Sequence, residues 1–267
     1  MANESKLAKR RAGKTAGKAV RKPTHTWQQT LVDTGTVVGQ SWHRYRASVF
    51  QGYVIIAIVT FIILAVLAKT VAYFTFDVTI THAVQSFTVG WFSGLMFAIS
   101  WIGFEPQAYG ITLLLILLLY ASGLKWEAVV SLVSVAISTT LGIVLKILIN
   151  RPRPSADLVK VVSTLHDYSF PSGHVLYFCV FFGFLLFLAY TLLSSSWLRT
   201  VLLIVLGALV TLVGLSRIYE GQHWASDVLA SYLLGSLCLA ATIFAYRMSK
   251  PRFSRKQPVG RDTPHGP

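Results

Sequence analysis

Long apolar runs separated by short polar stretches fill the chain from about residue 50 to residue 246. A transmembrane helix needs about 20 mostly apolar residues, and six runs meet or approach that length. We predict six spans, at residues 50–72, 104–121, 127–147, 174–193, 198–215 and 228–246. The expected fold is therefore all-α, a six-span transmembrane helical bundle with an interfacial helix between spans one and two.

Residues 77–103 carry the prediction of that interfacial helix. Apolar and polar residues are mixed in this stretch, and Gly90 and Gly94 interrupt it. We interpret it as an interfacial or re-entrant helix. The alternative is a seventh span, which would leave the two termini on opposite sides of the membrane.

Composition and charge add an orientation to this pattern. The 267 residues are 54% hydrophobic and only 13% charged, with a mean hydropathy of +0.60, which excludes an ordinary soluble domain. Ten Lys or Arg lie in residues 1–48 and six in residues 247–267. Because cytoplasmic segments carry an excess of positive charge, we expect a multi-pass plasma membrane protein with both termini in the cytoplasm.

The same pattern divides the chain into three parts. We predict a basic cytoplasmic tail at residues 1–48, disordered in part, a membrane domain at 49–247 and a second basic tail at 248–267. The tails are expected to contact the bilayer through anionic lipid head groups. Nucleic acid is the other partner that such charge allows, but the first tail has little aromatic interleaving and no fold to present it. We therefore predict no nucleic-acid partner.

Few basic residues remain on the predicted outer side of the membrane. They are Lys69, Lys146, Arg151, Arg153, Lys160 and Arg217. Positive charge there runs against the orientation bias, so a cluster of it is expected to have a function. Three polar segments on that side hold most of the candidate chemistry.

The first segment, KILINRPRP, runs from Lys146 to Pro154 at the end of the third predicted span. Lys146 and Arg153 are seven residues apart, which is two helical turns, and the prolines end the helix near them. Such a pair could hold one anion from two directions, since Arg makes paired hydrogen bonds to phosphate and Lys adds a compact charge. The alternative is that both cations only reach the membrane interface.

The second segment, FPSGH, is Phe170 to His174 at the start of the fourth predicted span. Pro171 can open a helix, Ser172 offers a hydroxyl, and Gly173 lets the backbone approach a ligand. Unpaired N–H groups at a helix start bind anions, and His174 could donate a proton. Alternatively, His174 is a structural residue near the membrane surface.

The third segment, SRIYEGQHWASD, runs from Ser216 to Asp227 between the last two predicted spans. His223 and Asp227 are four residues apart, so a helix places them on one face. An aspartate bonded to one imidazole nitrogen fixes the tautomer and leaves the other nitrogen free to attack or to accept a proton. Helix capping by Ser226 or Asp227 is the alternative, although it does not explain His223 or Arg217.

Together the three segments supply three cations, possible backbone donors and two histidines, one with a carboxylate behind it. This set suits phosphoryl transfer through a covalent phosphohistidine, in which one histidine attacks and the other protonates the leaving group. Metal ligation by the histidines is the rival chemistry. It fits less well, because the cations would repel a metal ion and the spacing matches no common metal motif.

The three motifs also resemble a known signature. K-x6-RP at Lys146–Pro154, PSGH at Pro171–His174 and SR-x5-H-x3-D at Ser216–Asp227 resemble the signature of the type 2 phosphatidic acid phosphatase superfamily. That superfamily also includes vanadium haloperoxidases and bacterial acid phosphatases. Three motifs in the family's order, 16 and 41 residues apart, make a specific match.

The resemblance implies a role for each matching residue. The phosphate-binding residues would be Lys146, Arg153, Arg217, Ser172 and Gly173. The catalytic residues would be His223 as nucleophile, Asp227 as its orienting partner and His174 as general acid. Arg151 and Lys160 have no place in the signature; they could meet a second phosphate, but solvated loop charges are the preferred interpretation.

The resemblance further implies an activity. Members of the membrane branch hydrolyse a phosphomonoester or pyrophosphate of a lipid without a metal or other cofactor, on substrates such as phosphatidate, phosphatidylglycerophosphate or undecaprenyl pyrophosphate. The active site would then lie at the extracytoplasmic face. The alternatives are a vanadate-dependent peroxidase and a non-catalytic phospholipid-binding or transport protein. Outside the signature, Glu220 either pairs with a nearby cation or faces water, and Trp224 is interpreted as an interfacial anchor.

Overall fold

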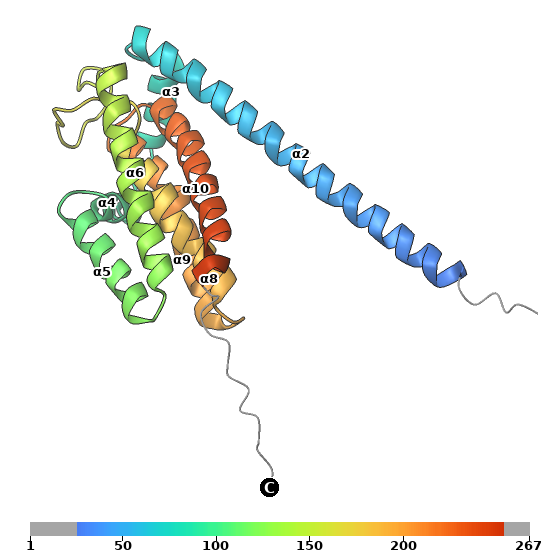
Figure 1. The fold of residues 1–267 in the computed structure, drawn as a ribbon. Helices are drawn as coiled ribbons and strands as arrows, with labels where there is room; N and C mark the ends of the chain where they lie inside the picture. Colours follow the sequence, from blue (N-terminus) through green and yellow to red (C-terminus); the bar gives the residue numbers. More distant parts are fainter. Residues whose placement is uncertain (1–25, 254–267) are drawn as a thin grey trace, which may run out of the picture. The chain divides into compact units, whose positions relative to one another are not determined.

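A computed structural model of the chain describes the backbone of residues 26–253 and the side chains of residues 45–249. Within these residues every regular element is a helix, as predicted (Figure 1). The chain divides by its internal contacts into two units, Met1–Gly52 and Tyr53–Pro267. Packing and the candidate site are described for the second unit. Most of the two predicted basic tails lies outside the described side chains.

Five of the six predicted spans are found among the described residues, with ends that differ by at most five residues. They are Tyr45–Thr70 of α2 (Thr26–Thr70), α6 (Lys125–Ile149), Gly173–Leu192, α9 (Trp197–Tyr219) and Ala225–Ser249 of α10 (Ala225–Phe253). The span Gly173–Leu192 is built from α7 (Gly173–Tyr177), a π-helical turn η1 (Phe178–Phe182) and α8 (Gly183–Leu192). Because α2 begins at Thr26, residues 26–44 of the predicted tail are helical.

The predicted second span is broken. The apolar run 104–121 forms only α5 (Gln107–Ala121), whose 15 residues are too few to cross a bilayer alone. Together with α4 (Gly90–Ile102) it reaches the length and apolarity of a span, but the two helices are bent by 67°. The pair has the form of a broken span or a re-entrant loop, so the described residues hold five or six spans.

The stretch 77–103, which we interpreted as one interfacial or re-entrant helix, forms two helices. They are α3 (Thr75–Gln85), with 11 residues, and α4, with 13, so neither is long enough for the alternative seventh span. The two helices bury Asp77, Gln85 and Ser100, and those side chains find their partners inside the protein.

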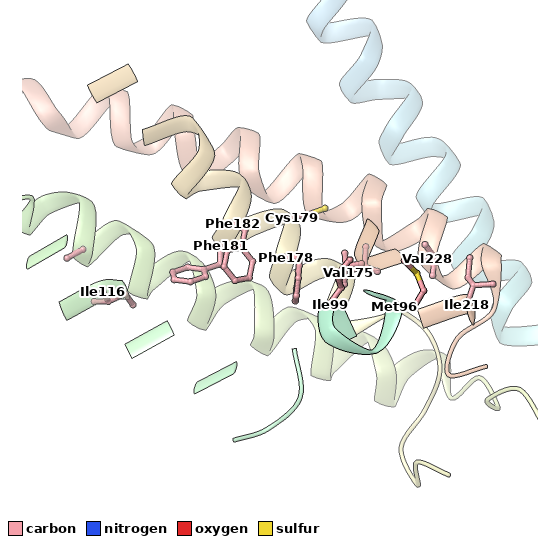
Figure 2. Packing of buried hydrophobic residues seen from close by; sticks show 12 residues of the cluster. Met96, Ile99, Ile116, Val175, Phe178, Cys179, Phe181, Phe182, Ile218 and Val228 are labelled. Atoms are coloured by element: carbon pink, nitrogen blue, oxygen red, sulfur yellow. The ribbon is translucent and has the colours of Figure 1, made fainter. Parts of the chain in front are cut away.

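The fourth span lies at the centre of the packed core. Its buried side chains Val175, Phe178, Phe181 and Phe182 pack with residues of α4, α9 and α10 in one cluster (Figure 2). The helices approach closely because small residues face one another: a Cβ on Gly235 of α10 would lie 2.6 Å from the Cβ of Cys179. This packing fixes the starts of α7 and α10 and the end of α9 relative to one another.

Backbone conformation determines how the loops at these helix ends pack against one another. Asn150, in the left-handed conformation, ends α6, and the loop that follows carries Arg151 and Arg153. The turn between α9 and α10 contains Gly221 with φ +64°, where a Cβ would lie 2.1 Å from the carbonyl oxygen of Lys160. Only glycine fits both that backbone conformation and that contact.

Trp224 is not an interfacial anchor, contrary to our interpretation of the sequence. Its side chain is buried, and the indole Nε1 donates to the carbonyl oxygen of Pro152 at 3.2 Å. The indole therefore ties the turn before α10 to the loop after α6, and both connections belong to the candidate site.

Candidate active site

The three predicted polar segments come together in the second unit. Arg153 of the first segment donates through Nη1 to the carbonyl oxygen of Gln222 at 2.6 Å and lies 3.2 Å from Nε2 of His223, both in the third segment. Ser172 of the second segment donates its N–H to Ser231 Oγ, one turn into α10 beyond Asp227, at 2.7 Å. Segments far apart in sequence thus form one site.

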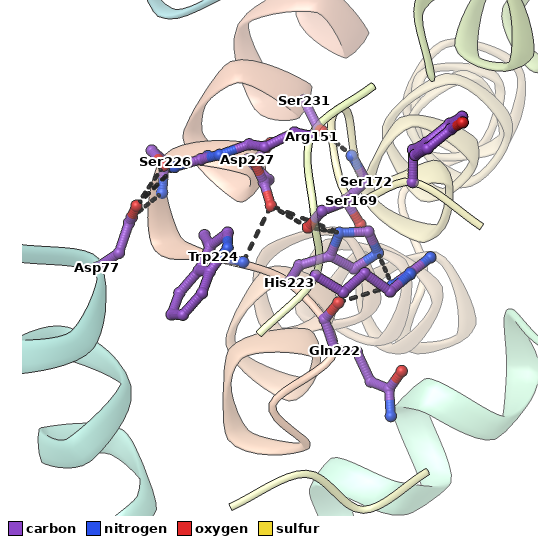
Figure 3. Close-up of polar contacts among 12 residues, drawn as sticks. Asp77, Arg151, Ser169, Ser172, Gln222, His223, Trp224, Ser226, Asp227 and Ser231 are labelled. Atoms are coloured by element: carbon purple, nitrogen blue, oxygen red, sulfur yellow. Dashed lines mark hydrogen bonds and ion pairs between the residues drawn. The ribbon is translucent and has the colours of Figure 1, made fainter. Parts of the chain in front are cut away.

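His223 lies at the centre of the site with only 2% of its surface exposed. Its Nδ1 is 3.8 Å from Asp227 Oδ2 and 3.5 Å from Ser169 Oγ, and the Ser169 hydroxyl donates to Asp227 Oδ2 (Figure 3). Its Nε2 faces the Arg153 guanidinium, which can only donate. Nε2 is therefore the unprotonated nitrogen, and Nδ1 carries the proton toward Asp227 and Ser169.

Burial and charge keep this imidazole neutral. Loss of water lowers the pKa of His223 well below its usual range, and the nearby charges of Arg153, Lys146 and Arg217 lower it further. A neutral ring with a free Nε2 lone pair is the form that can attack an electrophile.

Lys146 and Arg153 share a carboxylate that we did not expect. Lys146 Nζ is 2.6 Å from Asp167 Oδ2, and Arg153 Nη2 is 2.7 Å from Asp167 Oδ1. Partial burial raises the pKa of Asp167, but the hydrogen bonds and charges of the two cations outweigh it and lower the pKa to about 2. Asp167, 55% exposed, is thus an anion on the two cations that we predicted to bind phosphate.

Arg217 is fully buried at the end of α9 and still has donors to offer. Its Nη1 donates to Glu220 Oε2 at 2.9 Å and to Ser100 Oγ, and the guanidinium lies over the Phe104 ring at 4.9 Å. Its Nε and Nη2, like the hydroxyl of Ser172, have no hydrogen-bond partner among the residues that the structure describes. A buried donor without a partner is costly, so an anion that accepts from these groups would satisfy them.

Glu220 follows the first of the two interpretations drawn from the sequence, because it pairs with a cation, Arg217. Burial raises the pKa of its carboxyl, against the opposing effects of Arg217 and of the Ser100 hydroxyl. The ion pair with Glu220 therefore orients the Arg217 guanidinium at the end of α9.

His174, at the start of α7, is held by the end of α4. Its Nε2 lies 3.2 Å from the carbonyl oxygen of Ser100, and its ring meets Phe104 edge-on at 4.8 Å. A Cβ on Gly103 would lie 2.3 Å from the His174 ring, so the close approach requires glycine there. Ser100 contacts both His174 and Arg217, and therefore links the second segment to the third.

Asp227 is held from behind by Arg151, which corrects a further interpretation. We expected Arg151 to be a solvated loop charge, but it is fully buried and its Nη1 is 2.5 Å from Asp227 Oδ1. The second carboxylate on Arg151 is Asp77 of α3, at 3.0 Å. Lys160, by contrast, is exposed and bonds through its backbone to Gln85.

Several residues of the site were missed in the sequence. They are Asp77, Ser100, Asp167 and Ser169. A lone acid in an apolar stretch is a signal for Asp77, since such charges are rare and paired in membrane proteins. Nothing in the pattern distinguishes the two serines from others in the chain.

The described part of the chain contains no group of three or more His, Cys, Asp or Glu side chains arranged to hold a metal ion. The charges that surround His223 are mostly positive, so the arrangement is built for an anion. Donors on Arg217 and Ser172 that have no partner in the described part of the chain, two further cations and an unprotonated imidazole nitrogen together suit phosphoryl transfer to nitrogen.

Known proteins are similar to this chain in sequence and in fold. The sequence profile of the PAP2 superfamily matches residues 127–252. Phosphatidylglycerophosphatase B of Bacillus subtilis is 31% identical over 179 residues, which cover 66% of this chain and 86% of that protein. An undecaprenyl-diphosphatase of Sulfolobus acidocaldarius is 32% identical over 194 residues, 69% of this chain and 86% of that protein. The crystal structure of a transmembrane PAP2-type phosphatidylglycerolphosphate phosphatase from Bacillus subtilis superposes with a TM-score of 0.63 at 25% identity, over 76% of this chain and 98% of that one. The chain therefore belongs to the PAP2 superfamily and is a multi-pass membrane phosphatase.

Proposed function

We propose that this protein is a lipid phosphate phosphatase that works through a phosphohistidine on His223 and uses no metal ion or other cofactor. The observation that carries the proposal is that Nε2 of His223 lies 3.2 Å from the Arg153 guanidinium, in a site where Arg217 and Ser172 have polar side-chain atoms without a partner among the described residues. Those donors fit the non-bridging oxygens of a phosphoryl group.

The reaction takes two steps in this geometry. His223 Nε2 attacks phosphorus and the bond from phosphorus to the lipid oxygen breaks, while protonated His174 gives its proton to that oxygen. Water then attacks the phosphohistidine, His174 takes a proton from the water, and the phosphorus–nitrogen bond breaks. Inorganic phosphate leaves, and His223 and His174 return to their starting states.

The charged side chains act by holding the phosphoryl group and the ring. Lys146, Arg153 and Arg217 stabilise the charge on its oxygens, with the hydroxyl of Ser172 and the backbone of Gly173 beside them. Asp227, through Nδ1 of His223, stabilises the positive ring that forms when Nε2 is phosphorylated.

The substrate is a phosphorylated lipid of the bilayer. The named activities of the two relatives support either a phosphomonoester, such as phosphatidylglycerophosphate, or a diphosphate, such as undecaprenyl pyrophosphate. Phosphatidate, a third candidate, rests on the motif resemblance alone. We place the site at the extracytoplasmic face of the plasma membrane and both termini in the cytoplasm, because the terminal segments hold most of the Lys and Arg.

Phosphate release by purified protein in detergent tests the proposal. The assay contains EDTA and a panel of phosphatidate, phosphatidylglycerophosphate and undecaprenyl pyrophosphate, and compares wild type with His223→Ala and Lys160→Ala. Lys160 is the matched control, an exposed cation on the same loop as Arg153. We expect turnover in EDTA that disappears with His223→Ala and persists with Lys160→Ala. Equal activity of wild type and His223→Ala, or a requirement for metal, would contradict the proposal.

A further inference from the structure

Behind the candidate nucleophile lies a buried chain of three charges. Arg151 stands between two carboxylates, with Nη1 2.5 Å from Asp227 Oδ1 and Nη2 3.0 Å from Asp77 Oδ2 (Figure 3). All three side chains are fully buried. Asp227 belongs to α10, Arg151 to the loop after α6 and Asp77 to α3. The three charged side chains therefore join three separate parts of the fold.

Further contacts fix the positions of these three charged side chains. Asp77 accepts from the N–H and from the hydroxyl of Ser226, both at 2.8 Å, at the start of α10. Arg151 also donates through Nε to the carbonyl oxygen of Ala72 at 3.0 Å and lies over the Phe74 ring at 5.2 Å. The guanidinium therefore cannot turn away from Asp227 without losing several bonds.

Burying three charges is expensive for a purely structural purpose. A serine or asparagine caps a helix start without any ion pair, and buried ion pairs are often no more stabilising than apolar side chains of similar volume. The start of α10 thus needs neither Arg151 nor Asp77 for capping alone. Their charges call for another explanation.

The charge balance around His223 explains why Arg151 and Asp77 are charged. Arg151 alone would neutralise Asp227, and the histidine would then face a pair of no net charge. With Asp77 on the other side of the guanidinium, the trio keeps a net charge of about −1. The ring needs that charge, because a phosphorylated imidazole is positive and three cations already surround it.

The charged and titratable groups around His223 come from every neighbouring element. They are Lys146 of α6, Arg153 and Asp167 of the following loop, His174 of α7, Arg217 and Glu220 at the end of α9, and Asp227 of α10. The carboxylates Asp167 and Glu220 are themselves paired with cations. Among the charged groups of the described residues, Asp227 is the carboxylate that faces Nδ1, at 3.8 Å, so the net charge of its cluster matters most for the ring.

We propose that Asp77 is a positioning residue of the active site. Arg151 holds the Asp227 carboxylate in place, and Asp77 offsets the charge of Arg151, so that Asp227 is fixed and still faces His223 with net negative charge. The catalytic part of this inference rests on the proposed function. The electrostatic part does not, since it concerns proton binding by His223.

Titration of His223 tests the electrostatic part without any substrate. The histidine ring resonances of the labelled protein in detergent micelles are followed by NMR against pH, with His223→Ala to assign the peak. Asp77→Asn removes a negative charge at nearly constant shape, so we expect the pKa of His223 to fall by about one pH unit. Arg151→Gln removes a positive charge, and we expect a rise of similar size.

The double variant and a neutral control separate charge from structure. Asp77→Asn with Arg151→Gln returns the net charge to that of Asp227 alone, so the pKa of His223 should return close to the wild-type value. Ser226→Ala deletes hydroxyl bonds to both Asp77 and Arg151 without changing charge. It should lower the melting temperature and leave the titration where it was.

Activity then tests the catalytic part. Asp77→Asn is expected to lower kcat about tenfold with little change in KM, and the double variant to recover part of that loss. An unchanged titration in Asp77→Asn, or a double variant that titrates like Asp77→Asn, would overturn the inference. If Asp77→Asn does not fold, the double variant and Arg151→Gln decide in the same way. A wild type without phosphatase activity would contradict the proposed function, while the titrations would still decide the role of Asp77.

Discussion

Replacing Asp167 with Asn tests whether its carboxylate competes with the substrate. In the structure Asp167 binds both Lys146 and Arg153, the cations that we propose to hold the phosphoryl group. A phosphate that takes those positions must displace the carboxylate. The Asn side chain has nearly the same shape but no charge, so the variant removes the competition and leaves the loop largely as it is.

The size of the effect follows from the pKa of Asp167. Lowering from 3.8 to about 2 corresponds to an interaction of about 2.5 kcal/mol with the two cations. Because the side chain is 55% exposed, solvent screening reduces the usable part to about 1 kcal/mol. We expect KM to fall about fivefold in Asp167→Asn, since about 1.4 kcal/mol corresponds to a factor of ten, and kcat to stay within about twofold.

Initial rates of phosphate release against lipid concentration measure this change. Asp157→Asn is the matched control, since it removes a carboxylate of the same loop whose own pKa is lowered through a hydrogen bond with Ser155 and which forms no ion pair among the described residues. The advantage of Asp167→Asn should shrink at high salt, because screening weakens the ion pairs of the wild type. Inhibition by inorganic phosphate should strengthen in Asp167→Asn by the same factor as KM falls.

The sign of the pH dependence adds a check. A carboxyl whose folded pKa is depressed contributes stability above its unfolded pKa, near 3.8, and loses it as the pH falls through about 2. Asp167 therefore stays ionised at every practical assay pH, and the ratio of KM between wild type and variant should not vary from pH 5 to pH 8. A rise in KM, or a fall in kcat of tenfold or more, would refute the reasoning, because Asp167 would then help to arrange the cations.

Three further predictions concern residues of the site and the turn that supports it. Arg217→Lys should lower kcat/KM about 100-fold in the phosphate-release assay while the protein still folds, because an ammonium cannot reproduce the paired donors of the guanidinium. The pKa of His223 is depressed by burial and cations, and the nucleophile must be unprotonated, so activity should hold as the pH falls from 8 to 6.5; a steep loss across that range would contradict a neutral ring. Gly221→Ala should destabilise the protein by about 2 kcal/mol or more in thermal melting, since the position has φ +64° and the new Cβ would meet the Lys160 carbonyl at 2.1 Å. Gly110→Ala, in a helix with open space around the new Cβ, is its control and should be neutral or stabilising.

The sequence predicted most spans because length and apolarity decide whether a segment can cross a bilayer. The second span shows the limit of that rule. Residues 104–121 form a continuous apolar run apart from a few polar positions, and hydropathy alone favours one straight helix. Gly103 and Pro106 punctuate its start, and the chain turns there so that Gly103 can approach His174. The bend thus combines local turn residues with a tertiary contact between Gly103 and His174, and hydropathy reports neither.

The motif residues were predictable because phosphoryl transfer demands particular groups at fixed places near helix ends. Their supporting residues were not, because support comes from segments distant in sequence. Ser100 lies 117 residues before Arg217, and Asp77 lies 149 residues before Ser226. A serine or an acid that completes a hydrogen-bond set carries no periodicity of its own. What selects it is the geometry of partners that only the folded chain brings near.

Arg151 and Arg153 illustrate the difference within one motif. They are two residues apart, chemically identical and separated by a proline, and the sequence assigned a role to only one of them. In the folded chain Arg153 lies 3.2 Å from Nε2 of His223, whereas Arg151 lies 2.5 Å from the Asp227 carboxylate behind the ring. The loop thus places one cation at each end of the His223–Asp227 pair. Arg153 contacts the nucleophilic nitrogen, where a phosphoryl group would arrive. Arg151 holds the carboxylate that stabilises the charged ring. Two arginines that are close in sequence therefore have opposite electrostatic roles.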